Sequence, residues 1–183
     1  MCTSFVYARA EDCYDPFLMP LRPDLAALPA WGFAFPGPLR DELTALALAG
    51  TKTTTAGLLA EMEAEGEALP EPGMHEVLLD SEERPVALIE TVECRVARLA
   101  DVDDRHAIDE GEGYADAHEF RVAHERFWNG YLDDLRTTLG NPDFALDDDT
   151  LVVLQRFCVV EHLADRSAAR AFRPAGLSDC PAR

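Results

Sequence analysis

A lysine followed by three threonines is the first stretch of this sequence whose residue types could do chemistry. Lys52 is the one lysine among 16 basic residues, and the rest are arginines. Arginine holds its charge as well as lysine does but gives up no proton, so a retained lysine marks a position where an amine is useful. Such an amine can anchor an anion or, if burial lowers its pKa, act as a general base. An exposed lysine in a threonine-rich strand would show the same pattern.

The threonines place hydroxyl groups beside this amine. In an extended segment Thr53 and Thr55 share one face and Thr54 lies on the other. Because the preceding helical pattern stops at Gly50, Lys52 lies at a corner between a helix and a strand, where side chains can converge. A hydroxyl next to a lysine base is an available nucleophile or oxyanion donor.

A first glutamate that could face Lys52 is Glu90. It lies at an even position of the predicted strand 85–96, between Leu88 and Val92 on the apolar face. A buried carboxylate is costly unless it is paired, and Lys52 would be a suitable partner. A β-bulge that turns Glu90 outward is an equally good interpretation.

A second glutamate, Glu110, precedes the closely spaced glycines Gly111 and Gly113. Glycine allows sharp backbone turns that expose the residues before them. Acidic residues in front of a helix often serve only its N-terminus and dipole, and the pattern alone favours that interpretation here.

The elements that must position these residues alternate without a regular repeat. Few helices and several strands predict an α+β domain, a small barrel with helices at its edges. On the last helix, Arg121 and His124 lie one turn apart and could line a binding site. We predict helices at 38–49, 58–65 and 116–135, strands at 76–80, 85–96 and 150–161, and solvated acidic loops at 101–104 and 147–149.

Composition restricts the classes of partner. The formal net charge of −19 repels nucleic-acid backbones and anionic membranes, and we expect no membrane association. Five widely spaced cysteines without a metal-like cluster indicate a reduced, cytoplasmic protein. Because the sequence has no metal-ligand motif and no dinucleotide fingerprint, we expect no cofactor and no metal. Proline-rich residues 1–30 predict an extended leader and residues 164–183 a frayed tail.

Taken in order, these segments resemble the ASCH (activating signal cointegrator homology) domain family over residues 31–163. The resemblance rests on several motifs rather than one. They are Trp31-Gly32-Phe33, Leu46-Ala47-Leu48-Ala49-Gly50, Thr51-Lys52-Thr53-Thr54-Thr55, Glu63 to Pro70 with Gly73, Ile89-Glu90-Thr91, Glu110-Gly111-Glu112-Gly113, Arg121 with His124 and Phe127, and Phe157-Cys158-Val159-Val160.

The resemblance implies a PUA-like small β-barrel whose mouth binds RNA or a nucleoside-like ligand. In the family's N(4)-acetylcytidine amidohydrolases, the catalytic residues correspond to Lys52, Thr55 and Glu110. This chain departs from those enzymes at Gly57, where they have an arginine, and at Tyr114, where an aspartate is usual. It is similar instead to a longer ASCH branch, for which we expect Glu90, Thr53, Arg121 and His124 to contact the ligand.

Two classes of function follow, with a third ranked last. The first is metal-free hydrolysis of an acyl-amide on a modified pyrimidine nucleoside, with Lys52 as base, Thr55 as the activated hydroxyl and Glu110 orienting them. The second is a non-catalytic module for single-stranded RNA, with a basic groove and stacking aromatics. The third is ribonuclease activity of an ASCH barrel. Candidates for the RNA groove are Arg40, Arg121, Arg126, Trp31, Phe33 and Trp128.

Overall fold

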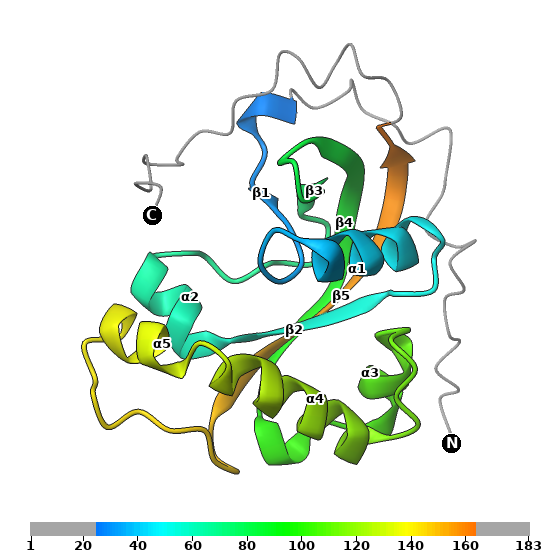
Figure 1. The fold of residues 1–183 in the computed structure, drawn as a ribbon. Helices are drawn as coiled ribbons and strands as arrows, with labels where there is room; N and C mark the ends of the chain where they lie inside the picture. Colours follow the sequence, from blue (N-terminus) through cyan, green and yellow to red (C-terminus); the bar gives the residue numbers. More distant parts are fainter. Residues whose placement is uncertain (1–24, 164–183) are drawn as a thin grey trace, which may run out of the picture. The chain divides into compact units, whose positions relative to one another are not determined.

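A computed structural model describes residues 25–163, which form an α+β fold as predicted. The five strands of its mixed sheet follow the order β1-β3-β4-β5-β2, so the sheet that takes the place of the expected barrel is open, with β1 and β2 at its ends (Figure 1). The predicted leader and tail lie outside the described residues, apart from 25–30. The strands are β1 Ala30–Trp31, β2 Thr54–Leu58, β3 His75–Leu79, β4 Pro85–Arg98 and β5 Leu151–His162.

The helices are short, and α1 and α2 follow the predicted start and stop signals. Pro38 occupies the first turn of α1, where its missing N–H costs nothing. Gly66 ends α2 in the left-handed conformation. The bounds are α1 Pro38–Leu48, α2 Leu59–Glu65, α3 Asp104–Asp109, α4 Ala117–Asn129 and α5 Leu132–Thr138, with single 3₁₀ turns at Leu25–Ala27 and Leu99–Asp101.

The described chain divides into two compact units. The first contains residues 25–50, 75–90 and 158–163. Within it, β1 pairs parallel with β3, and β3 pairs antiparallel with β4, with His75 opposite Glu90. A tight turn between β3 and β4 is built on Asp80, which accepts hydrogen bonds from the backbone N–H groups of Glu82 and Arg84, each at 2.9 Å.

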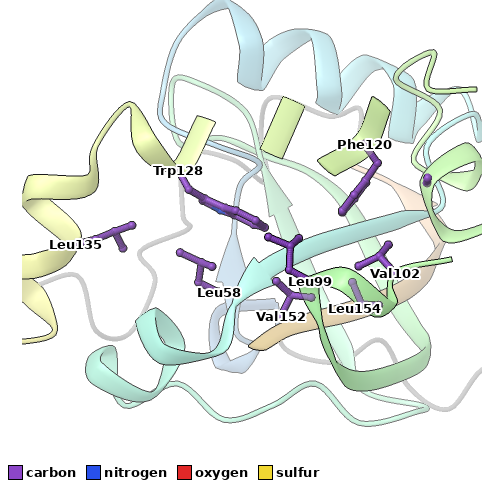
Figure 2. Close-up of a cluster of buried hydrophobic side chains, with 9 residues drawn as sticks. Leu58, Leu99, Val102, Phe120, Trp128, Leu135, Val152 and Leu154 are labelled. Atoms are coloured by element: carbon purple, nitrogen blue, oxygen red, sulfur yellow. The ribbon is translucent and has the colours of Figure 1, made fainter. Parts of the chain in front are cut away.

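The second unit contains residues 51–74 and 91–157, with β2 antiparallel to β5. Its hydrophobic core is formed by apolar residues from β2, β5 and the helices. Figure 2 shows Trp128 and Phe120 of α4 reaching into this core. The buried members are Leu58, Leu99, Val102, Ala107, Phe120, Trp128, Leu135, Val152 and Leu154.

One predicted helix is two helices in the structure. The sequence pattern gives a single helix over 116–135, but α4 ends at Asn129, and α5 begins at Leu132. Gly130 has low helix propensity, and Asn129 uses its side chain to donate to the carbonyl of Glu125 at 2.7 Å. The apolar face continues across the break, which is why periodicity alone does not reveal it.

A further helix, α3, occupies a segment in which the sequence predicts no helix. Asp103 caps it, its carboxylate accepting from the backbone N–H of His106 at 2.9 Å. With only 6 residues, α3 is too short to show a hydrophobic period. Its presence moves Glu110 from the start of the long helix to the C-terminal end of α3, so the expectation that Glu110 serves a helix N-terminus is wrong.

Candidate functional site

Lys52 lies at the centre of a cluster of ionisable side chains within the second unit. Its ammonium nitrogen Nζ is 3.0 Å from Oε2 of Glu110 and 2.6 Å from Oε1 of Glu112. The hydroxyl of Tyr114 donates to Oε2 of Glu112 at 2.8 Å. The structure therefore brings together Lys52 and Glu110, which the sequence predicts, and adds two neighbours.

A turn that requires glycine holds the two carboxylates on one amine. Gly111 has a φ of 68°, in the left-handed region. A Cβ at this position would lie 2.4 Å from the carbonyl oxygen of Thr51, closer than any real contact. Only glycine allows the turn between Glu110 and Glu112 to approach the backbone next to Lys52.

Two histidines flank the carboxylate of Glu110. His106 Nε2 lies 3.7 Å from Oε1, and His124 Nε2 lies 3.7 Å from Oε2. Since 3.7 Å is longer than a hydrogen bond, the buried atoms His106 Nε2 and Glu110 Oε1 have no hydrogen-bond partner. Together Lys52, His106, Glu110, Glu112, Tyr114 and His124 are called the Lys52 cluster below.

The ionisable groups of the Lys52 cluster are shifted in different directions. Burial raises the pKa of Glu110, but Lys52 and the neighbouring His124, His106 and Glu112 together lower it by more, and the net pKa lies well below the usual range. Burial raises the pKa of Glu112 despite Lys52, and the nearby Glu110 raises it further. Burial also raises the pKa of Tyr114. Two neighbouring carboxyl groups whose pKa values are shifted in opposite directions are suited to acid–base chemistry.

Exposure distinguishes an inner and an outer part of the cluster. The side chains of Lys52 and Glu110 are each 1% exposed. The side chain of His124 is 13% exposed and that of Glu112 is 17% exposed, and Tyr114 is also partly exposed. A ligand that approaches the cluster therefore meets His124, Glu112 and Tyr114 before Lys52.

The threonines after Lys52 are placed differently from one another. The hydroxyl of Thr54 is buried and donates to the carbonyl of His106 at 2.9 Å, and that of Thr53 donates to the carbonyl of Asp109 at 3.2 Å. Both hydroxyls tie the strand to α3. Thr55 follows Thr54 in β2, so strand alternation directs it to the other face of the strand from Thr54.

Glu90 has a contact within its own unit, the first. Its carboxylate lies 3.5 Å from Nε2 of His75, its cross-strand neighbour, and its side chain is 35% exposed. The fully buried positions around it are Ile89 and Thr91. The interpretation that Glu90 lies on the buried face of its strand is wrong, because the odd positions of β4 form the more buried face here. Its pairing with Lys52 stays a prediction.

Arg121 also lies outside the cluster. Its guanidinium is held by Glu125 and Asp148, each at 2.7 Å, and these hydrogen bonds raise its pKa.

Other residues suggested for an RNA groove are used within the fold. Arg40 donates to the carbonyls of Phe33 and Ala34 at 2.9 and 2.6 Å, and Phe33 and Trp128 are buried core residues that cannot stack on bases.

Sequence reasoning missed three members of the cluster: His106, Glu112 and Tyr114. His106 precedes Glu110 by four residues, a spacing that is informative only once α3 is known to be a helix. Glu112 follows Glu110 across one glycine, and this Glu-Gly-Glu spacing was the available signal. Within residues 25–163, no three His, Cys, Asp or Glu side chains are arranged to hold a metal ion.

The fold and site define an α+β domain with a buried lysine held by two glutamates of a glycine-rich turn. The sequence profile of the ASCH domain matches residues 30–161, and the chain belongs to the ASCH domain family, which has a PUA-like fold. ASCH domains generally bind nucleic acid. None of the described helices is long and apolar enough to span a bilayer.

Two solved structures share the fold. Protein EF3133 from Enterococcus faecalis V583 is 24% identical with a TM-score of 0.65, over 79% of this chain and 83% of that one. The ASCH domain from Lactobacillus crispatus JV V101 is 25% identical with a TM-score of 0.60, over 71% of this chain and 77% of that one. No curated protein matches the chain.

Proposed function

We propose that this ASCH domain binds a small nucleoside-like ligand at the outer part of the Lys52 cluster and hydrolyses an acyl-amide on it. The observation that supports this most directly is the pair of carboxylates on the Lys52 ammonium, at 3.0 and 2.6 Å. A buried amine between two carboxyl groups of unlike pKa is an arrangement suited to exchanging protons.

The charge of the cluster favours a neutral ligand over a polyanion. Lys52 contributes one positive charge, and the carboxylate of Glu110 balances it. A phosphate would meet no net positive charge there, and the whole chain carries −19. A nucleoside without phosphates avoids this repulsion, and N(4)-acetylcytidine is the member of this class that the resemblance suggests.

The reaction needs a group that protonates the departing amine. Glu112 is suited to this because its raised pKa favours the carboxylic acid, and it is partly exposed. Lys52 bridges Glu112 to Glu110 and can replace a proton that Glu112 gives away. The nucleophile in this scheme is water rather than Thr55, since Thr55 is directed to the other face of β2 from Thr54.

The test is incubation of the full chain with N(4)-acetylcytidine, following the release of cytidine by chromatography. Lys52→Arg keeps the charge but exchanges no proton, and we expect it to lower turnover at least about 100-fold. Glu61→Gln is the matched control, because Glu61 is also a half-buried carboxyl bonded to a tyrosine, Tyr131, at 3.1 Å. It should keep turnover within about twofold. No cytidine release by the wild-type chain would refute the proposal.

Single-stranded RNA is the second candidate ligand, because nucleic-acid binding is general among ASCH domains. A titration with a fluorescent oligonucleotide distinguishes the two. Binding that falls steeply with salt, in a chain without turnover, would favour this alternative.

A further inference from the structure

His124 has two ring nitrogens in different surroundings. Nδ1 lies 3.0 Å from the backbone carbonyl oxygen of Phe120. A carbonyl oxygen only accepts hydrogen bonds, so the hydrogen is on Nδ1. In the neutral ring the lone pair is then on Nε2, the nitrogen that lies 3.7 Å from Oε2 of Glu110.

Packing fixes the orientation of this ring. The imidazole stacks on the ring of Phe120, with a centroid separation of 3.8 Å and an interplanar angle of 24°. Its centroid lies 5.2 Å from Trp128 and 6.1 Å from Tyr114. A ring held by a hydrogen bond and by three aromatic neighbours presents one nitrogen to the cluster without a large loss of side-chain freedom.

Burial, more than the charged groups around the ring, favours its neutral form at rest. Burial lowers the pKa of His124, Glu110 opposes this, and the ammonium of Lys52 lowers the pKa further. The titratable groups that face it are Glu110 and His106 from the α3 segment, Lys52 before β2 and Tyr114 of the glycine-rich turn. When the ring gains a proton, the nearby carboxylate of Glu110 offsets the new charge.

We propose that His124 is the proton acceptor of the site, with Nε2 taking a proton from the attacking water. This inference rests on the proposed function. As the bond forms between the water oxygen and the carbonyl carbon, one water proton moves to Nε2. As the C–N bond breaks, Glu112 gives its proton to the amine nitrogen. The acid product releases its remaining proton to solvent, and Lys52, after passing a proton to Glu112, is reprotonated by the proton that His124 holds.

The kinetic test compares two histidines of the same helix. His124→Gln should lower kcat for N(4)-acetylcytidine by about 100- to 10,000-fold, the usual range for a general base, with KM changed less than about threefold. In His124→Gln, the fall of kcat/KM at low pH that protonation of His124 causes should also be absent. Imidazole in solution should restore turnover to His124→Ala. His118→Gln, on the exposed side of α4, should leave all of these unchanged.

A spectroscopic measurement tests the tautomer without relying on turnover. Long-range ¹H–¹⁵N correlation of the histidine-labelled chain at pH 7 should show His124 protonated at Nδ1 and unprotonated at Nε2. A proton on Nε2 would overturn the inference. Turnover that His124→Gln retains would overturn the acceptor role alone, whereas absence of turnover in the wild-type chain would overturn the proposed function and the acceptor role together.

Discussion

Two pairs of opposite charge in this protein differ in what their atoms are used for. In the first unit, Asp80 accepts from two backbone N–H groups, and its other oxygen accepts from Nε of Arg84 at 2.8 Å. Every one of these bonds closes the turn between β3 and β4. In the second unit, the pair of Lys52 and Glu110 joins residues 58 positions apart and is buried.

The two pairs differ in exposure, in residue type and in the hydrogen bonds that they leave unmade. The turn pair is half exposed at Arg84 and uses arginine, which holds a fixed geometry. The Lys52 pair bears the desolvation cost of two buried charges, uses the residue that can exchange a proton, and leaves Oε1 of Glu110 without a hydrogen bond. A buried ion pair that costs desolvation free energy and leaves one of its own oxygens without a hydrogen bond indicates a functional role.

The largest expected effect comes from removing one partner of each pair. Lys52→Met leaves buried carboxylates without their cation, and the free energy of unfolding should fall by about 3–5 kcal/mol. Arg84→Met should leave it nearly unchanged, because Asp80 keeps its backbone donors. Urea denaturation measures both. Equal losses in the two variants would remove the distinction drawn above.

The next effect concerns the turn that places Glu112 on Lys52. Gly111→Ala puts a Cβ 2.4 Å from the carbonyl oxygen of Thr51 in a left-handed backbone, whereas Gly113→Ala meets no atom within 4 Å. Steric overlap and backbone strain together should cost Gly111→Ala about 3 kcal/mol. The loss in Gly113→Ala should be smaller and due to strain alone. Thermal unfolding of both variants tests this, and a larger loss at Gly113 would contradict it.

The smallest expected effect is on the pH dependence of stability, which two carboxyl groups of the second unit, Glu110 and Glu61, change in opposite directions. The pKa of Glu110 is lowered in the fold, so its contribution to stability is complete above the unfolded pKa of about 4.3 and is lost as the pH falls toward the folded value. Burial raises the pKa of Glu61, so its contribution is complete below about pH 4.3 and is lost as the pH rises through the folded pKa.

Stability curves of two variants against pH separate these contributions. The wild-type chain should lose stability as the pH rises above about 4.3 because Glu61 ionises, and Glu61→Gln should remove that loss. The wild-type chain should also lose stability as the pH falls below about 4.3 because Glu110 is protonated, and Glu110→Gln should remove that loss. Curves that change in the same direction for both variants would show that Lys52 does not govern Glu110 as described.

Much of the fold follows from local signals in the sequence. Pro38 and Gly66 mark the start of α1 and the end of α2, and the apolar runs of β4 and β5 are long enough to identify. The break at Gly130 was not predicted, because the apolar face continues from α4 into α5. The helix α3 was not predicted either, because it is shorter than two helical turns and shows no hydrophobic period.

The candidate site was predictable in part. Lys52 stood out by its residue type, and Glu110 followed from the resemblance to ASCH domains. The position of Glu112 depends on the left-handed turn at Gly111, and that of His106 on α3. Glu90 was misplaced because alternation along β4 identifies two faces but not which of them is more buried. Those facts arise from tertiary packing and not from spacing.

The most direct test of the account is the free energy of unfolding of a double variant, Lys52→Met with Glu110→Leu. Replacing a buried ion pair by apolar residues of similar volume is often neutral or stabilising, by about 1–4 kcal/mol. We therefore predict that the double variant is at least as stable as the wild-type chain while releasing no cytidine from N(4)-acetylcytidine. A double variant as unstable as Lys52→Met alone would show that the pair is kept for folding, contrary to this account.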